Sequence, residues 1–384
     1  MFKKIKLLVF VTGLFMSLNT FAQLPTAPEL AKRMHVGVNL GNTLEAVCDE
    51  NAWGAGKTSQ KLIDSIKAAG FNTIRIPTAW FCHSDTITNT INRQWIARVK
   101  EVVDYCVKDD LYVILNMHWD TGWLENRINT KNQLEVNKRQ KKYWTQIANY
   151  FKKYDEHLLF AGANEPSAKD AKQVEILLSY YQTFIDAVRA TGGNNASRTL
   201  IVQGPETDVE KTLELMNSLP KDKIKDRLMV EVHYYTPFQF CLLKKDAEWG
   251  KMFYYWGKDF HSKTDLERNC TWGEEELVDS LFNGLKTKFV DKGIPVILGE
   301  FGAYRRKIDD SANQELNNKS VEHFNKYVVK RAISNGIIPY YWDTPNNLFN
   351  RDTGEVLDKK NIKVIMEGAE EAKTKSRSRK TKDQ

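Results

Sequence analysis

The stretch Leu158-Leu159-Phe160-Ala161-Gly162-Ala163-Asn164-Glu165-Pro166 decides the fold of this chain. Its apolar run from Leu158 is typical of a buried strand, and the run is followed by a carboxylate held between an amide and a proline. Because Pro166 has no N–H to donate to a strand ladder, we expect the strand to stop before it, with Glu165 facing out of its carboxyl end. A surface glutamate before a turn would give the same tripeptide, so the rest of the chain has to supply a partner for Glu165.

Apolar runs of this kind recur along the chain, and segments with helical periodicity separate them. The predicted strands are His35–Leu40, Thr73–Ile76, Leu111–Asn116, Leu158–Gly162, Leu200–Val202, Leu228–Val232, Pro295–Gly299 and Ile337–Tyr341. Alternating strands and helices predict a parallel sheet, and eight such units are the number that closes a (β/α)8 barrel.

An open, doubly wound sheet is the alternative, and it would need a glycine-rich phosphate loop after its first strand. The first predicted strand is instead followed by Gly41-Asn42-Thr43-Leu44-Glu45. We therefore predict an α/β protein with a single (β/α)8 TIM barrel.

The two ends of the chain are expected to lie outside this barrel. Residues 1–22 carry three lysines, an apolar stretch and a small residue, Ala22, which is the pattern of a secretory signal peptide. The segment 371–384 is basic and poor in apolar residues, so we predict a disordered tail there. No linker rich in Pro, Gly or Ser divides residues 23–370, which leaves one catalytic domain. We expect an exported monomer, periplasmic or extracellular, without a membrane span after cleavage near Ala22.

The formal charge of +7 is concentrated in the signal and the tail, and the remaining body has a formal charge close to zero. The body therefore has no basic stripe that would favour nucleic acid. Among the five cysteines, Cys106 lies in a helical pattern and is expected in the core, while pairings Cys48–Cys82 and Cys241–Cys270 are both left open. No closely spaced Cys/His cluster is present, so neither a structural zinc site nor another metal or cofactor is expected.

A segment of about 40 residues, from His233 to Trp272, has no regular pattern but is rich in aromatic residues. Disordered segments carry few aromatics, so we predict that this segment forms a wall of a binding cleft. A local core that packs the loop onto the barrel is the alternative.

Polar and aromatic side chains gather at the carboxyl ends of the predicted strands, where the active site of such a barrel lies. These ends are Arg75-Ile76-Pro77, Asn116-Met117-His118-Trp119, Asn164-Glu165-Pro166, His233-Tyr234-Tyr235, Gly299-Glu300-Phe301-Gly302 and Trp342-Asp343. Each can be explained singly by packing or by a structural ion pair. Their occurrence together at one rim favours an active site.

Glu165 and Glu300 follow the fourth and seventh strands and are expected to face each other across the barrel. Two carboxyl groups about 5 Å apart are what a retaining glycosidase uses, whereas an inverting enzyme leaves room for a water molecule. Arg75 and the hydroxyl of Tyr235 would keep Glu300 ionised as the nucleophile. Glu165, close to that charge, is expected to have a raised pKa and to act as general acid and base. Asn164 would bind the sugar 2-hydroxyl, and a pyranose would stack on Trp342.

These motifs, together with Gly37-Val38-Asn39-Leu40-Gly41-Asn42-Thr43, resemble glycoside hydrolase family 5 enzymes of the cellulase type over essentially the whole mature chain. The resemblance implies that Glu165 and Glu300 are catalytic and that the other matching positions bind substrate, namely Asn39, Arg75, His118, Trp119, Asn164, His233, Tyr235 and Trp342. Trp119 departs from the pattern, since a second histidine is common there. The implied activity is an endo-β-1,4-glucanase acting on a β-linked polysaccharide or oligosaccharide; a β-1,4-mannanase and a catalytically silent glycan-binding protein are the alternatives.

Overall fold

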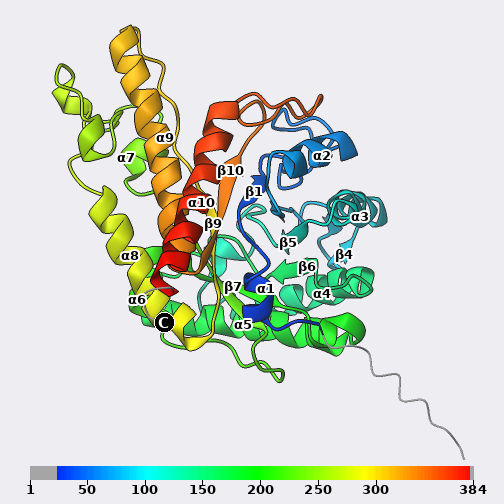
Figure 1. Ribbon diagram of the computed structural model, residues 1–384. Helices are drawn as coiled ribbons and strands as arrows, with labels where there is room; N and C mark the ends of the chain where they lie inside the picture. Colours follow the sequence, from blue (N-terminus) through cyan, green and yellow to red (C-terminus); the bar gives the residue numbers. More distant parts are fainter. Residues whose placement is uncertain (1–23, 381–384) are drawn as a thin grey trace, which may run out of the picture.

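Eight parallel strands close into a barrel in the computed structural model, which describes residues 24–380 (Figure 1). Around the barrel the strands follow the order β1, β10, β9, β8, β7, β6, β5 and β2. Their bounds are β1 Gly37–Leu40, β2 Thr73–Ile76, β5 Tyr112–Asn116, β6 Leu158–Ala161, β7 Leu200–Asp208, β8 Leu228–Tyr234, β9 Val296–Phe301 and β10 Ile337–Asp343. The predicted (β/α)8 barrel is confirmed, and each predicted strand overlaps one of these eight.

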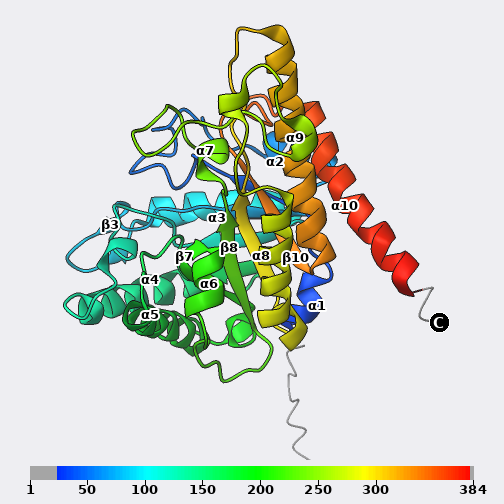
Figure 2. The ribbon, with the colours of Figure 1, turned by 90° about the vertical axis from the view of Figure 1, so that its left-hand side faces the viewer.

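Helices surround the barrel and connect its strands (Figures 1 and 2). They are α2 Gln60–Ala68, α3 Arg93–Lys108, α4 Gln133–Phe151, α5 Ala171–Ala190, α6 Val209–Leu215, α8 Glu275–Lys288, α9 Ser311–Ser334 and α10 Lys359–Lys380, with the short α1 Ala27–Ala31 and α7 Phe238–Cys241. A small hairpin, β3 Ser84–Asp85 and β4 Thr90–Ile91, precedes α3. Side chains at the start of several helices accept hydrogen bonds from otherwise unpaired backbone N–H groups, for example Asn92, Asp170 and Asp310.

The apolar side chains form two separate cores. The larger one fills the layer between strands and helices. The smaller one lies inside the lower barrel, where Ile114, Leu159, Ile201 and Met229 from different strands meet Leu30 of α1. Because α1 and this inner core close the amino-terminal end, the open end of the barrel is the carboxyl-terminal rim.

Part of the aromatic segment after β8 packs against α9, whereas Phe238 and Trp249 stay exposed. Phe240, Phe253, Tyr255 and Trp256 are buried, and Trp256 meets Phe324 of α9 edge to face at 5.1 Å. The alternative, a local core, describes these residues, since a long loop needs apolar contacts of its own to hold one conformation.

Helix α10 continues to Lys380 and so includes residues 371–380 of the predicted tail, while residues 381–384 lie outside the described residues. Glu371, the first residue of the predicted tail, accepts ion pairs from Lys326 at 2.7 Å and Lys330 at 2.6 Å on α9. The segment is also rich in Lys and Arg, which favour helix. A basic composition therefore does not by itself predict that a segment lacks a helix.

Cys106 is fully buried, as predicted, and all five cysteines are free thiols. The predicted signal peptide, residues 1–22, lies outside the described residues. Within residues 24–380 no helix combines the length and apolar character needed to cross a membrane.

Candidate active site

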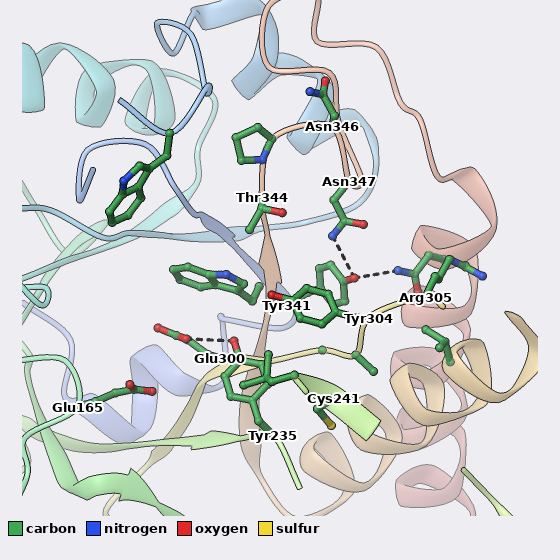
Figure 3. Close-up of a pocket in the computed structure, with 18 of the residues that line it drawn as sticks. Glu165, Tyr235, Cys241, Glu300, Tyr304, Arg305, Tyr341, Thr344, Asn346 and Asn347 are labelled. Atoms are coloured by element: carbon green, nitrogen blue, oxygen red, sulfur yellow. Dashed lines mark hydrogen bonds between the residues drawn. The ribbon is translucent and has the colours of Figure 1, made fainter. Parts of the chain in front are cut away.

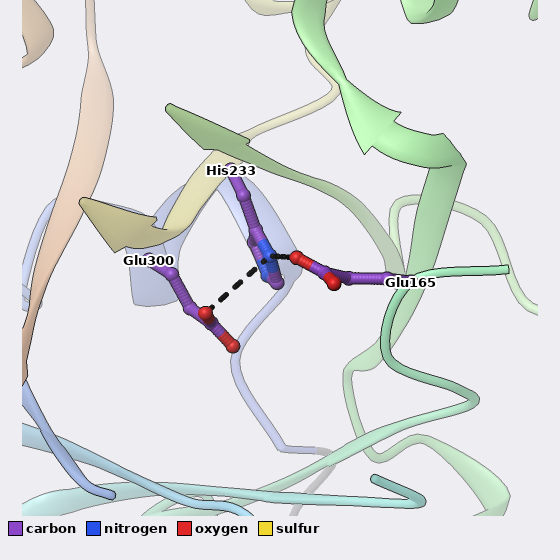
Figure 4. A group of neighbouring side chains, drawn as sticks. All are labelled: Glu165, His233 and Glu300. Carbon is purple, nitrogen blue, oxygen red and sulfur yellow. Dashed lines mark hydrogen bonds and ion pairs between the residues drawn. The ribbon is translucent and has the colours of Figure 1, made fainter. Parts of the chain in front are cut away.

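Glu165 and Glu300 meet at the open rim of the barrel, on either side of His233 (Figure 4). One carboxylate oxygen of each glutamate and one ring nitrogen of His233 all lie within 4.8 Å of one another. Glu165 follows β6, His233 belongs to β8 and Glu300 to β9, and the pairing of β8 with β9 places His233 beside Glu300. The predicted meeting of the two glutamates is therefore confirmed.

The end of β6 is set by a side chain of the neighbouring strand. Gly162 still donates its backbone N–H to the Ile201 carbonyl, but the N–H of Ala163 goes to the side-chain oxygen of Gln203 at 2.8 Å. The ladder stops at this point and the chain turns toward the rim. Glu165 then projects into the cleft with 47% of its side chain exposed.

Arg75 of β2 lies beneath the two glutamates and connects four side chains. It donates to Glu300 Oε1 at 3.0 Å, to Asn164 Oδ1 at 2.8 Å and to Asn39 Oδ1 at 3.0 Å, and it forms an ion pair with Glu231 at 2.8 Å. Asn39 in turn donates to the backbone carbonyl of Gly299 at 2.8 Å. Both Arg75 and Asn39 are completely buried. Their predicted role in substrate binding does not fit this burial, and they instead hold Glu300 and Asn164 from below.

Glu231 is a central member of this buried network that sequence analysis missed. Its side chain pairs with Arg75, accepts from Gln203 at 2.7 Å and lies 3.3 Å from His233 Nε2. Burial pushes its pKa up, but Arg75 and then His233 outweigh burial and hold the pKa below the ordinary value. A glutamate in the middle of the apolar run 228–232 was the available signal, since buried carboxylates are rare unless paired.

Gly299, next to Glu300, leaves the space that the Glu231 carboxylate occupies. A Cβ atom at this position would lie 2.1 Å from Glu231 Oε1. We expect Gly299→Ala to displace Glu231 and break its ion pair with Arg75, lowering the free energy of unfolding by about 3 kcal/mol. Misplacement of Glu300 would lower kcat by roughly 10²-fold.

Urea unfolding and steady-state kinetics test this prediction. Gly250→Ala is the matched control, because the nearest atom to its added Cβ is the end of the Gln239 side chain at 3.4 Å. If Gly299→Ala and Gly250→Ala had the same free energy of unfolding, the prediction would be contradicted, because Glu231 would then be able to move away from the added Cβ without loss of stability.

His233 carries a positive charge between three carboxylates. Its Nδ1 lies 2.8 Å from Glu165 and 3.7 Å from Glu300. Burial opposes the charge, but Glu300, Glu165 and Glu231 together raise the pKa of His233 to about 9.

The raised pKa of His233 predicts a pH-dependent contribution to stability. Since the pKa rises from 6.5 to about 9 on folding, the charged imidazole stabilises the fold fully below pH 6.5 and loses this effect as the pH rises through 9. We expect the gap in Tm between the wild type and His233→Asn to narrow over this range. Thermal unfolding at several pH values, with NMR titration of the imidazole, measures it; a gap independent of pH would contradict the charge.

The pKa values of the two glutamates differ in the opposite direction from the one predicted. Burial in the cleft raises the pKa of Glu165, but the hydrogen bond and charge of His233, with the charge of Arg75, leave it lowered. Burial also raises the pKa of Glu300, and here the charges of His233 and Arg75 do not outweigh it. The expectation of a raised pKa for Glu165 is therefore wrong for the ligand-free protein, because the imidazolium proton of His233 lies against it.

The cleft above these residues has a volume of about 660 Å³. Its floor and walls include most of the predicted binding residues, namely His118, Trp119, Asn164, Tyr235 and Trp342. Tyr235 donates its hydroxyl to Glu300 Oε2 at 3.1 Å, and burial raises its pKa well above the ordinary value, so the proton stays in place.

His118 is a neutral donor that faces this cleft. Asn116 accepts from the Thr78 backbone through Oδ1, so its Nδ2 donates to His118 Nδ1 at 3.0 Å and leaves the ring proton on Nε2. Burial lowers the pKa of His118 well below the ordinary value. Its ring stacks parallel to Trp342, with ring centres 6.0 Å apart.

Several cleft residues come from loops and were not predicted. Trp53 follows β1, Tyr304 and Arg305 follow β9, and Asn346 and Asn347 follow β10. In Figure 3 the cavity extends from Glu165 and Glu300 toward Tyr304 and Arg305. Tyr235, Cys241 and Leu242 are the part of the aromatic segment that reaches the cleft lining. The position of a loop depends on packing between distant segments, so a local sequence pattern does not predict it.

A carboxylate pair at the ends of the fourth and seventh strands of a (β/α)8 barrel, beside an open cleft with exposed tryptophans, defines a glycoside hydrolase site. The chain matches the family model Cellulase (glycosyl hydrolase family 5) over residues 35–348. It belongs to this family and is a glycoside hydrolase, namely an endo-1,4-β-glucanase of the cellulase type.

Relatives and solved structures agree with this assignment. The chain is 35% identical to a xyloglucan-specific endo-β-1,4-glucanase of Bacteroides ovatus, over 89% of this chain and 70% of that protein. It is 34% identical to endoglucanase A of Paenibacillus barcinonensis, over 89% of this chain and 90% of that protein. A crystal structure of a xyloglucan-specific β-1,4-glucanase from a ruminal metagenomic library, in complex with XXLG, is 41% identical with a TM-score of 0.83 and covers 90% of this chain and 97% of that one.

Proposed function

We propose that this protein is a retaining endo-β-1,4-glucanase that hydrolyses internal linkages of plant glucans, with xyloglucan, mixed-linkage glucan and cellulose-type chains as its substrate class. The observation that carries the proposal is the approach of the two carboxylates to within 4.8 Å. That separation fits a covalent glycosyl-enzyme intermediate and leaves no room for the water that an inverting enzyme places between its carboxyl groups.

Glu300 is the nucleophile in this mechanism. Arg75 donates to one of its oxygens at 3.0 Å and Tyr235 to the other at 3.1 Å, so both bonds favour the ionised form and aim it at the anomeric carbon. Attack forms the ester to the sugar and breaks the bond to the leaving oxygen. Water later hydrolyses the ester and restores the carboxylate.

Glu165 protonates the leaving oxygen and afterwards removes a proton from the attacking water. In the free protein, the group that supplies this proton to Glu165 is His233, whose Nδ1 lies 2.8 Å from Glu165 Oε1. A sugar that covers the exposed half of Glu165 would desolvate the carboxylate and raise its pKa, which moves the proton onto Glu165 when substrate is present. Esterification of Glu300 then removes its charge and prepares Glu165 to act as the base.

Substrate positioning follows from groups left free in the cleft. The Oδ1 of Asn164 accepts a hydrogen bond from Arg75. Its Nδ2 is therefore left to donate to the sugar 2-hydroxyl. Trp342, and the half-exposed Trp53 and Trp119, offer flat apolar faces for pyranose rings. Such an open, aromatic cleft supports binding of several sugars of a chain.

The protein is proposed to act as an exported monomer. The basic, apolar and small-residue pattern of residues 1–22 supports a cleaved secretory signal. Mass spectrometry of the protein recovered from its native host would identify a mature chain that begins near Gln23, and gel filtration would give its size.

The activity is tested by reducing-end release from xyloglucan, mixed-linkage glucan, carboxymethylcellulose and mannan with purified protein. We expect turnover on the three glucans and retention of the β configuration in the first product, observed by NMR. Dominant mannan hydrolysis would make the protein a mannanase, and binding without any turnover would make it a silent glycan-binding protein.

A further inference from the structure

A second cavity of about 380 Å³ adjoins the far end of the catalytic cleft, and its chemistry differs from that of the cleft. It is lined by Lys244, Met252, Tyr254, Tyr304, Arg305, Arg306 and Lys307. Tyr304 and Arg305 line both cavities, so a substituent on a bound chain can pass from one to the other. No carboxylate lines the second cavity, whereas Glu165 and Glu300 line the first.

The positive charge in this cavity is mostly not neutralised by ion pairs. Arg305 pairs with Glu322 and Asp358. Within residues 24–380, Lys244, Arg306 and Lys307 form no ion pair with a carboxylate. Three cations without a carboxylate partner among the described residues therefore remain around a concave surface.

The cations are held in place by contacts other than ion pairs. Arg306 donates to the backbone carbonyls of Gln239, Phe240 and Leu243, and its Nε is buried without a partner. Lys244 lies over the ring of Tyr304 at 5.5 Å. Arg306 therefore fixes the 239–243 segment against the loop after β9, while its charge stays at the cavity wall.

We propose that this basic cavity is a subsite for an acidic substituent of the glucan, a carboxylate carried by a uronosyl or carboxyalkyl group. Guanidinium and ammonium groups bind carboxylates through charge-assisted hydrogen bonds, and the tyrosine rings provide contact for the sugar that carries the group. Near the catalytic glutamates the same substituent would be repelled. The inference rests on the proposed glucanase activity and adds a preference for acidic branches to it.

Two β-1,4-glucan derivatives that differ in substituent charge test the inference: carboxymethylcellulose and the neutral hydroxyethylcellulose. For Lys244→Gln/Lys307→Gln we expect kcat/KM on carboxymethylcellulose to fall roughly threefold to tenfold, with kcat/KM on hydroxyethylcellulose unchanged. Added salt would bring the wild type toward the variant on the charged polymer only.

Lys223→Gln/Lys225→Gln is the matched control, with the same change of net charge at exposed lysines before β8, at the opposite end of the barrel. An equal ratio of the two activities in all three proteins, or the same loss in the control, would overturn the subsite. Retardation in native gels that contain either polymer measures binding without turnover, so the subsite is tested even if the proposed hydrolysis fails.

Discussion

Replacement of Glu300 by alanine is expected to lower kcat on glucans by roughly 10⁴-fold to 10⁶-fold, because it removes the group that forms the covalent intermediate. Arg75 and the hydroxyl of Tyr235 would remain around the vacated carboxylate position, since each has a contact of its own with the barrel or the cleft. A small anion can enter that position. We therefore expect azide to restore turnover of a cellobioside with an activated aryl leaving group, with the α-glycosyl azide as product.

The anomeric form of the azide makes this result specific. Attack from the vacated nucleophile position gives the α product by a single inversion. Glu175→Ala, at an exposed position of α5, is the control and should keep wild-type activity. Ordinary activity of Glu300→Ala, or a β-azide as its product, would show that another group is the nucleophile.

Replacement of Glu165 by alanine is expected to have an effect that depends on the leaving group. Loss of the general acid should lower kcat on glucans by about 10²-fold to 10⁴-fold. An activated aryl cellobioside needs no proton to leave, so it should still form the glycosyl-enzyme in a rapid burst. Hydrolysis of that intermediate would then be slow, since no base remains to activate water.

Azide distinguishes this variant from the previous one. It would attack the covalent intermediate of Glu165→Ala from the cleft side and give the β-glycosyl azide by two inversions. Burst kinetics with NMR of the product measure both expectations. The same loss on glucans and on activated glycosides would place Glu165 outside proton transfer, and His233, which lies 2.8 Å from it, would be the next residue to test.

Much of the fold and the meeting of Glu165 with Glu300 were predictable from sequence because both depend on local patterns. Short apolar runs alternate with helical periodicity, and this alternation predicts the strands and helices. The predicted stop at Pro166 was not what ended β6, because the side chain of Gln203 already takes the N–H of Ala163. A closed barrel brings all strand ends to one rim, so the meeting of Glu165 with Glu300 followed from topology.

The supporting network was not predictable in the same way. Glu231 lies in the middle of a strand and matters because of its ion pair with Arg75, which is a contact between β8 and β2 across the barrel. The family resemblance assigned Arg75 and Asn39 to substrate binding, yet both are completely buried. The aromatic segment after β8 has a composition that suits either a cleft wall or a local core, and only its packing on α9 distinguishes them.

The sequence by itself determined the barrel, the family and the two glutamates that meet at the rim, since periodicity, strand ends and motifs lie within short stretches of chain. Only the tertiary structure decided how closely Glu165, His233 and Glu300 approach one another, and that the loops after β8 and β9 enclose a basic cavity. The physical reason is that pKa values and cavities depend on distances between side chains from different strands and loops, and folding alone sets those distances.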